Sequence, residues 1–141
     1  MSEVSFMPIL CASDINVYSM ARAFHEAYGI KSLMVARARG AMTKDTNIID
    51  YKEVPGLDET QVFLKTMDEL YEEYGPAGKG KTLILMGCAD HYVRLIVENK
   101  EYLKNKGFVL PYSDKQVLDN ITLKESFYEL CDRYGLDYAK T

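Results

Sequence analysis

Short apolar runs alternate with amphipathic helical patterns along most of this chain, and this alternation restricts the possible folds more than any other feature. The runs that favour strands lie at residues 6–11, 31–37, 48–54, 82–86 and 108–112. Strands joined through a helix pair in parallel, because a tight hairpin cannot connect them. The sequence therefore predicts an α/β fold with an open, mainly parallel, Rossmann-like sheet of about five strands and helices on both faces.

The residues within and between the runs predict the position of two strands in the sheet and the ends of two helices. The run at 82–86 is the most apolar and is expected in the centre of the sheet, whereas the run at 48–54 alternates apolar with polar residues, as edge strands do. Asp58, followed three residues later by Gln61, is predicted to cap the helix after the third strand. A single helix is predicted after the fourth strand, ending at Gly107.

The alternation stops after residue 112. Ser113 with Gln116, and Thr122 with Glu125, each have the spacing of a capping box, so two helices are predicted in succession with no strand between them. Residues 136–141 then favour an extended segment. We therefore expect an α/β domain over residues 1–112 and a helical linker over residues 113–141.

Composition narrows the class of protein. The chain has 141 residues and a formal net charge of −4, which argues against a nucleic-acid partner. The first ten residues lack a basic segment, and no apolar run reaches the roughly 18 residues of a membrane-spanning helix. The three cysteines (Cys11, Cys88 and Cys131) have neither disulfide-framework nor metal-site spacing. These features predict a cytoplasmic protein with reduced thiols and no membrane partner.

Two loops are candidates for a binding site. Ligands of open α/β sheets bind outside the carboxyl ends of the strands, which selects residues 11–18 and 86–92. Their polar side chains are predicted substrate contacts, and these are Ser13, Asp14, Asn16, Asp90 and His91. Backbone amides at the following helix N-termini would add donors for a carboxylate or phosphate. Ser13 or Asp14 has the alternative role of capping a helix that stops before Gly29, and His91 that of a solvated side chain.

Several catalytic motifs are missing or stand in the wrong context. Residues 75–81, GPAGKGK, lie between a helix and a strand, whereas a phosphate-binding loop follows a strand, so they are predicted to form a flexible connection. No G-x-G-x-x-G follows the first strand, and no G-x-S-x-G occurs. Arg37, Arg39 and Lys44 form a small basic cluster that is either an anion contact or a solubilising loop. No catalytic or metal-binding residue is assigned.

The end of the chain resembles ATP-grasp ligases at the junction where a small N-terminal domain meets the ATP-grasp module. That family has a basic residue opening a helix, an aromatic or apolar residue three positions later, a glycine and a P-x-T-like entry into a strand. The matching positions are Lys124, Phe127, Gly135 and residues 138–141, YAKT. Residues 8–29 and the loop LMGCADHY also resemble the amino-acid ligase branch, which includes D-aspartate ligase and carbamoyl-phosphate-synthase-like ligases.

The resemblance implies a pre-ATP-grasp domain of a carboxylate–amine ligase. Such enzymes use ATP and Mg²⁺ to convert a carboxylate to an acyl phosphate, which an amine then attacks. Lys124 would contact the nucleotide, and a downstream ATP-grasp domain would be the partner within the same polypeptide. Small carboxylate and amine substrates are implied, with their identities left open.

Two departures from the family pattern affect this expectation. Ala139 stands where the family has proline, and nothing in this sequence matches the lid over ATP or the metal ligands. The chain alone is therefore expected to be inactive and to bind no cofactor tightly. Two alternatives stay open, namely a stand-alone α/β module that binds a small anion or nucleotide, and an interaction domain that forms a homodimer.

Overall fold

The computed structural model describes residues 3–140, which form two separate units. The first ends at Pro111 and the second begins at Tyr112. The elements of the first unit are β1 (Phe6–Cys11), α1 (Ile15–Tyr28), β2 (Ser32–Ala36), η1 (Ala41–Thr43), β3 (Ile49–Glu53), α2 (Thr60–Tyr74), β4 (Thr82–Gly87), α3 (Asp90–Glu98) and α4 (Lys100–Lys106). The second unit holds α5 (Lys115–Thr122) and α6 (Lys124–Tyr134).

The sheet of the first unit is open and parallel, as predicted. Its strand order is β3-β2-β1-β4, and every pair in it is parallel. The register aligns Ile9 of β1 with Leu33 of β2 on one side and with Leu85 of β4 on the other. The chain thus builds outward from β1 through β2 to β3, then returns to place β4 on the opposite side of β1.

The sheet differs from the prediction in two respects. It has four strands rather than about five, because residues 108–112 contribute only one isolated parallel bridge, between Val109 and Ile84. Pro111 has no N–H, so the ladder cannot continue through it. The strand at 82–87 also lies at the end of the strand order rather than at its centre. The central strands are β1 and β2, and every residue of β2 is buried.

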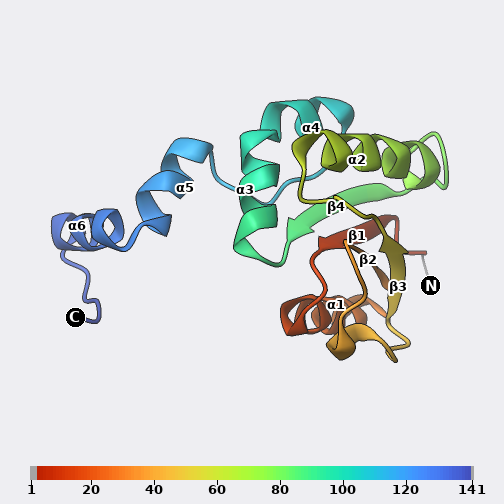
Figure 1. The fold of residues 1–141 in the computed structure, drawn as a ribbon, viewed down its shortest axis with the longest axis horizontal. Coiled ribbons are helices and arrows are strands. Elements are labelled where there is room, and N and C mark those ends of the chain that lie inside the picture. Colours follow the sequence, from red (N-terminus) through yellow and green to blue (C-terminus); the bar gives the residue numbers. More distant parts are fainter. Residues whose placement is uncertain (1–2, 141) are drawn as a thin grey trace. The chain divides into compact units, whose positions relative to one another are not determined.

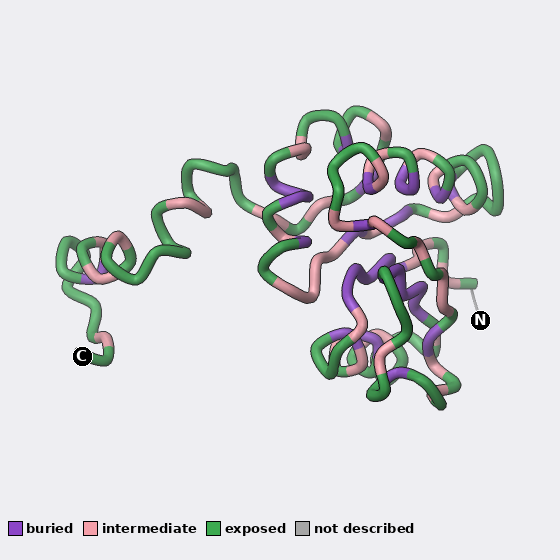
Figure 2. The backbone as a smooth tube through the Cα atoms, in the orientation of Figure 1, coloured by how far each residue is buried: buried purple, intermediate pink, exposed green. Residues whose placement is uncertain are grey.

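Helices cover both faces of the sheet (Figure 1). The helix α1 and the short η1 lie on one side, while α2, α3 and α4 lie on the other. Buried residues concentrate in the strands and on the inner faces of these helices (Figure 2). The largest fully buried side chains include Phe63 and Met67 of α2, Ile9 and Leu10 of β1, and Leu57 of the loop before α2. The sheet therefore has a hydrophobic core on each of its two faces.

Helix boundaries test the capping predictions. The Asp14 carboxylate accepts a hydrogen bond from the Asn16 amide at 3.0 Å, so Asp14 is the N-cap of α1, and Gly29 ends the helix with a left-handed φ of 66°. The predicted Asp58 cap of α2 is wrong, because Glu59 is the N-cap residue. The Asp58 carboxylate instead lies 3.2 Å from the Arg37 guanidinium.

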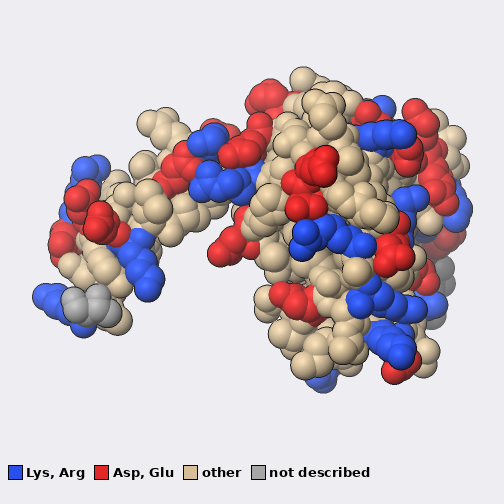
Figure 3. Space-filling view, viewed as in Figure 1, with Lys and Arg blue, Asp and Glu red and all other residues tan. Residues whose placement is uncertain are grey.

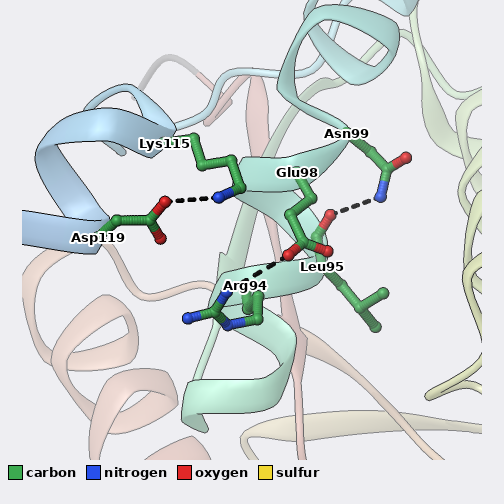
Figure 4. A network of polar contacts seen from close by, with 6 residues as sticks. All are labelled: Arg94, Leu95, Glu98, Asn99, Lys115 and Asp119. Carbon is green, nitrogen blue, oxygen red and sulfur yellow. Dashed lines mark hydrogen bonds and ion pairs between the residues drawn. The ribbon is translucent and has the colours of Figure 1, made fainter. Parts of the chain in front are cut away.

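The helix predicted after the fourth strand is two helices. Asn99 separates α3 from α4, and its side-chain amide donates to the Leu95 carbonyl at 2.8 Å (Figure 4). The Leu95 carbonyl accepts the Asn99 backbone N–H at 3.2 Å as well, so both nitrogens of Asn99 bond to the end of α3. Arg94 and Glu98 form an i,i+4 ion pair on the exposed side of α3. The predicted end at Gly107 holds for α4.

The second unit consists of two helices, as predicted, but its capping boxes are wrong. The N-cap residues are Asp114 and Leu123. Thr122 is still the last residue of α5, so Leu123 takes the extended N-cap conformation in its place. Lys115 pairs with Asp119 along α5 (Figure 4). The tail returns to α6, where the Tyr138 ring stacks on Tyr128 at a centroid distance of 4.5 Å. Thr141, part of the motif at 138–141, lies outside the described residues.

Gly87 provides a test of how tightly α3 packs on β4. A Cβ atom at Gly87 would lie 2.5 Å from the Val93 nitrogen and 2.8 Å from the Tyr92 carbonyl carbon, both of them backbone atoms. Gly87→Ala is therefore expected to lower the free energy of unfolding by about 2–3 kcal/mol through overpacking. Urea denaturation followed by circular dichroism measures this change.

Gly80→Ala is the matched control for this substitution. Gly80 has a φ of +74° and no atom within 4 Å of the added Cβ, so only the backbone conformation opposes the change. That cost is about 1 kcal/mol. Equal losses of stability for the two variants would contradict close packing of α3 on β4.

Candidate functional site

A cleft of about 560 Å³ lies at the carboxyl ends of all four strands. It is lined by residues that follow β1, β2, β3 and β4, so each strand contributes one part of its wall. The lining residues are Ala12, Ser13, Asp14, Ala36, Arg37, Ala38, Pro55, Gly56, Ala89 and Tyr92. Small side chains form most of the surface, which leaves room for a small ligand between the few polar groups.

The position of the cleft follows from the strand order. β1 and β4 are neighbours in the sheet, but the chain continues from β1 to β2 on the opposite side of β1. The loop after β1 and the loop after β4 therefore diverge where these two strands end. A backbone hydrogen bond of 2.9 Å from the Cys88 amide to the Cys11 carbonyl holds the two strand ends together. The two loops selected from the sequence are therefore neighbours in the structure.

Two close backbone approaches hold the loop after β1. Ala12 has a φ of 145°, a conformation that non-glycine residues rarely adopt, and its amide donates to the Val35 carbonyl at 3.3 Å. Gly40 lies against the same loop, since a Cβ atom there would be 2.0 Å from the Ser13 carbonyl oxygen. The loops after β1 and β2 are thus packed against each other at the mouth of the cleft.

Arg37 lines the cleft beyond β2, and it forms an ion pair with Asp58 of the loop after β3. Arg37 Nη1 lies 3.2 Å from Asp58 Oδ2. The loop that carries Asp58 is fixed by the buried Leu57 and by His91, whose Nε2 lies 3.0 Å from the Asp58 carbonyl oxygen. Both side chains of the pair are partly exposed, at 62% for Arg37 and 37% for Asp58. The pair therefore stands at the boundary between the cleft and solvent.

Tyr92 lies beside this pair and is buried. Burial raises the pKa of its phenol, with a further increase from the electrostatic influence of Cys11, while the nearby charge of Arg37 and a hydrogen bond from it act in the opposite direction. The phenol is accordingly neutral at physiological pH and can accept a hydrogen bond from Arg37. Tyr92 therefore lines the cleft as a neutral side chain that can form hydrogen bonds.

The thiols near the cleft are poor nucleophiles. Burial raises the pKa of the Cys88 thiol to about 11, with a smaller contribution from the carboxylate of Asp14. Burial likewise raises the pKa of Cys11, which lies in the core. Nucleophilic chemistry requires the thiolate. The side chains of the cleft thus favour binding of a ligand over covalent attack on it.

The five predicted contact residues divide into two groups. Ser13 and Asp14 line the cleft. Asn16, Asp90 and His91 are not among its lining residues. Asn16 donates to the Asp14 carboxylate from both its backbone and side-chain nitrogens, at 3.0 and 3.3 Å. His91 contacts the Asp58 carbonyl, and Asp90 is an exposed residue of the first turn of α3.

Arg37, Gly56 and Tyr92 were not among the predicted substrate contacts, although an anion contact was left open for the basic cluster that includes Arg37. Of the three basic residues grouped from the sequence, only Arg37 lines the cleft, whereas the Arg39 guanidinium lies over the Tyr51 ring at 5.1 Å. The position of Arg37 could have identified it, because Arg37 directly follows a fully buried strand and ligands of such sheets bind at the carboxyl ends of the strands. Tyr92 ends the loop 86–92 that was selected from the sequence, whereas Gly56, with a φ of 78°, carried no signal in one sequence.

The second unit and the surface add few constraints. Lys124 is the first residue of α6 and is exposed. Across residues 3–140, no three His, Cys, Asp or Glu side chains are grouped closely enough to hold a metal ion. None of the helices within that range is long and apolar enough to cross a membrane. Acidic and basic side chains are intermixed on the face drawn in Figure 3.

Comparison with known proteins supports the resemblance noted in the sequence. The chain is 40% identical over 136 residues to D-aspartate ligase of Enterococcus faecium (strain Aus0004). The match covers 96% of this chain and 32% of that enzyme, so the chain spans about a third of the length of this relative. No model of a protein family matches the chain, and no solved structure matches it. The similarity to D-aspartate ligase expected from the sequence is thereby confirmed.

The raised pKa of Cys88 predicts slow alkylation. With a pKa of about 11, about one thiol in a thousand is ionised at pH 8, and the fraction rises tenfold for each pH unit until it levels off near pH 11. Iodoacetamide labelling of the folded chain, quantified on the Cys88 peptide by mass spectrometry, measures the rate. The same peptide in guanidinium is the reference. A folded-state rate that levels off near pH 8.5 would contradict the burial of this thiol.

Proposed function

We propose that this chain is the N-terminal, substrate-binding part of an ATP-dependent carboxylate–amine ligase similar to D-aspartate ligase. The observation that carries the proposal is the 40% identity over 136 residues to that enzyme. The cleft at the β1–β4 switch supports it, because this is where open α/β sheets bind small ligands. The rest of such an enzyme accounts for the length of the relative that this chain does not cover.

In this proposal the cleft binds a small substrate of the ligation. Ser13 offers a hydroxyl, and Asp14 offers a carboxylate whose orientation is fixed by Asn16. Asp90 and His91 lie at the start of α3, where backbone amides favour an anionic group. His91 contributes indirectly, by holding the loop that carries Asp58. The cleft would therefore position a substrate while the bond-forming chemistry takes place on groups outside this chain.

The reaction proposed for the whole enzyme has two steps. ATP transfers its γ-phosphoryl group to the carboxylate of one substrate, which releases ADP and gives an acyl phosphate. The amine of the second substrate then attacks the acyl carbon, phosphate leaves with the electrons of the broken bond, and the nitrogen loses a proton to give an amide. Phosphoryl transfer depends on cations that neutralise the developing charge. The metal ligands would come from the remainder of the polypeptide, since the described residues offer no such group.

Lys124 is the residue of this chain proposed to contact ATP. It is an exposed cation that begins α6, where a lysine is mildly unfavourable for the helix dipole and gains from an anionic partner. The helical segment over residues 113–141 is proposed to lead into the ATP-grasp domain. Exposed apolar side chains of α5 and α6, among them Val117, Ile121 and Phe127, fit a segment that a further domain covers.

A second function is favoured by the self-contained cleft. Every lining residue belongs to the first unit, so a stand-alone module could bind a small anion without any other domain. This alternative predicts ligand binding without ATP-dependent chemistry in any longer polypeptide. It is distinguished from ligation by the experiment that follows.

A hybrid enzyme tests the proposed function. The segment of the Enterococcus faecium D-aspartate ligase that matches this chain is replaced by residues 1–141, and ATP-dependent formation of aspartyl hydroxamate from D-aspartate and hydroxylamine is measured. The expected result is activity within about tenfold of the parent enzyme, because a 40% identical segment supplies the same cleft. A soluble, folded hybrid with no D-aspartate-dependent hydroxamate would contradict the proposal.

Substitution of Lys124 tests its nucleotide contact in the same hybrid. Lys124→Ala is expected to raise the KM for ATP about tenfold or more, with the KM for D-aspartate unchanged, because a charge-assisted contact to phosphate is lost. Lys115→Ala is the matched control, since Lys115 begins α5 as Lys124 begins α6. Equal effects of the two substitutions would remove Lys124 from the nucleotide site.

A further inference from the structure

We infer that Arg37 is the carboxylate anchor of the cleft and that Asp58 is its built-in competitor, which a bound carboxylate must displace. This inference rests on the proposed function, in that it assigns a residue to recognise the acidic substrate. It takes up the anion contact that was left open for Arg37 in the sequence, and it predicts effects of opposite sign for two neighbouring side chains.

The distribution of charge in the cleft supports Arg37 as the anchor. Of the residues that line it, all of them in the described part of the chain, only Asp14 and Arg37 carry a formal charge. They belong to different strands, Asp14 to the loop after β1 and Arg37 to the end of β2. A guanidinium presents its donors in a planar fork that matches a carboxylate. The cleft thus offers one anionic group for an ammonium and one cationic group for a carboxylate.

Arg37 is held in place by Asp58 and by the Tyr92 phenol, and its guanidinium can still receive a carboxylate from the cleft. The ion pair with Asp58 joins one guanidinium nitrogen, Nη1, to one carboxylate oxygen, Oδ2, at 3.2 Å. This is a single contact, whereas an arginine and a carboxylate in the favoured geometry form two parallel hydrogen bonds. The side chain is 62% exposed, so a ligand in the cleft can reach it. A small carboxylate can therefore exchange for Asp58 and gain the second hydrogen bond.

The backbone around Asp58 is held by several contacts, although the Asp58 side chain is partly exposed. The Leu57 side chain before it is completely buried, and the Glu59 amide after it donates to the Gly56 carbonyl at 2.9 Å. His91 of α3 contacts the Asp58 backbone carbonyl at 3.0 Å. The loop therefore holds the Asp58 backbone in place, and the Asp58 carboxylate contacts Arg37 until a ligand carboxylate replaces it. An anionic ligand that binds Arg37 must break this contact, so the ion pair with Asp58 lowers the affinity of the cleft for such a ligand.

The test is a titration of the ¹⁵N-labelled 141-residue chain with D-aspartate, followed by NMR through the Arg37 side-chain Nε–H and backbone amides of residues 12–14 and 36–38. Arg37→Gln is expected to weaken binding about tenfold or more, because a charge-assisted hydrogen-bond pair is lost. Asp58→Asn is expected to strengthen binding by about threefold or more, because the competing charge is removed. Arg37→Lys should fall between the wild type and Arg37→Gln.

Arg39→Gln is the matched control, since Arg39 is two residues away and lies over Tyr51 rather than in the cleft. Its affinity for D-aspartate should stay within about twofold of wild type, as surface charges outside a site contribute little. Amide spectra of all four variants report whether each remains folded. Absence of a D-aspartate-induced shift at Arg37, or equal affinities of wild type, Arg37→Gln and Asp58→Asn, would overturn the inference.

The outcome is separable from that of the proposed function. Opposite effects of Arg37→Gln and Asp58→Asn, with no ligation by the hybrid enzyme, would support the anchor and contradict the ligase proposal. An active hybrid in which Arg37→Gln leaves the KM for D-aspartate unchanged would support the ligase proposal and contradict the anchor.

Discussion

The parallel pairing of β1 with two neighbours is the constraint on which the rest of the structure depends. β1 bonds to β2 along one edge and to β4 along the other, and its last four residues are buried. The loop after β1 leads into α1 on one face of the sheet and the loop after β4 leads into α3 on the other, so the two loops separate. The cleft exists because of this arrangement, and the hydrogen bond between Cys88 and Cys11 fixes its floor.

Tight backbone packing then turns the gap between loops into a site of defined shape. Gly40 brings the loop after β2 against Ser13, and Gly87 brings α3 against the end of β4. Neither position has room for a Cβ atom, so the walls are set by main chain rather than by mobile side chains. Onto these walls the chain places one ion pair, Arg37 with Asp58, and one neutral phenol, Tyr92. The result is a small cleft with a few polar groups, suited to holding a ligand in one orientation.

Much of the fold could be predicted from the sequence, since apolar runs and helical periodicity are local signals. Strand β1, helix α1 with a cap at Ser13 or Asp14, and the edge position of β3 all followed from such patterns. The predictions failed where contacts between distant parts of the chain determine the structure. β4 is strongly apolar yet lies at the end of the strand order, where helices cover both faces of the sheet and Val109 bridges to its outer side. Asp58 has the spacing of a cap but pairs with Arg37, a residue 21 positions away.

The same division applies to the site. Ser13 and Asp14 were predicted because they follow a recognisable strand, whereas Arg37 and Tyr92 join them only through the folding of separate loops. The central claim is that this cleft holds the acidic substrate of a ligase. A crystal structure of the hybrid ligase with D-aspartate bound tests it most directly. We expect the ligand between the ends of β1 and β4, with a carboxylate on Arg37 in place of Asp58. D-aspartate held entirely by the other domains, with Arg37 still paired to Asp58, would contradict it.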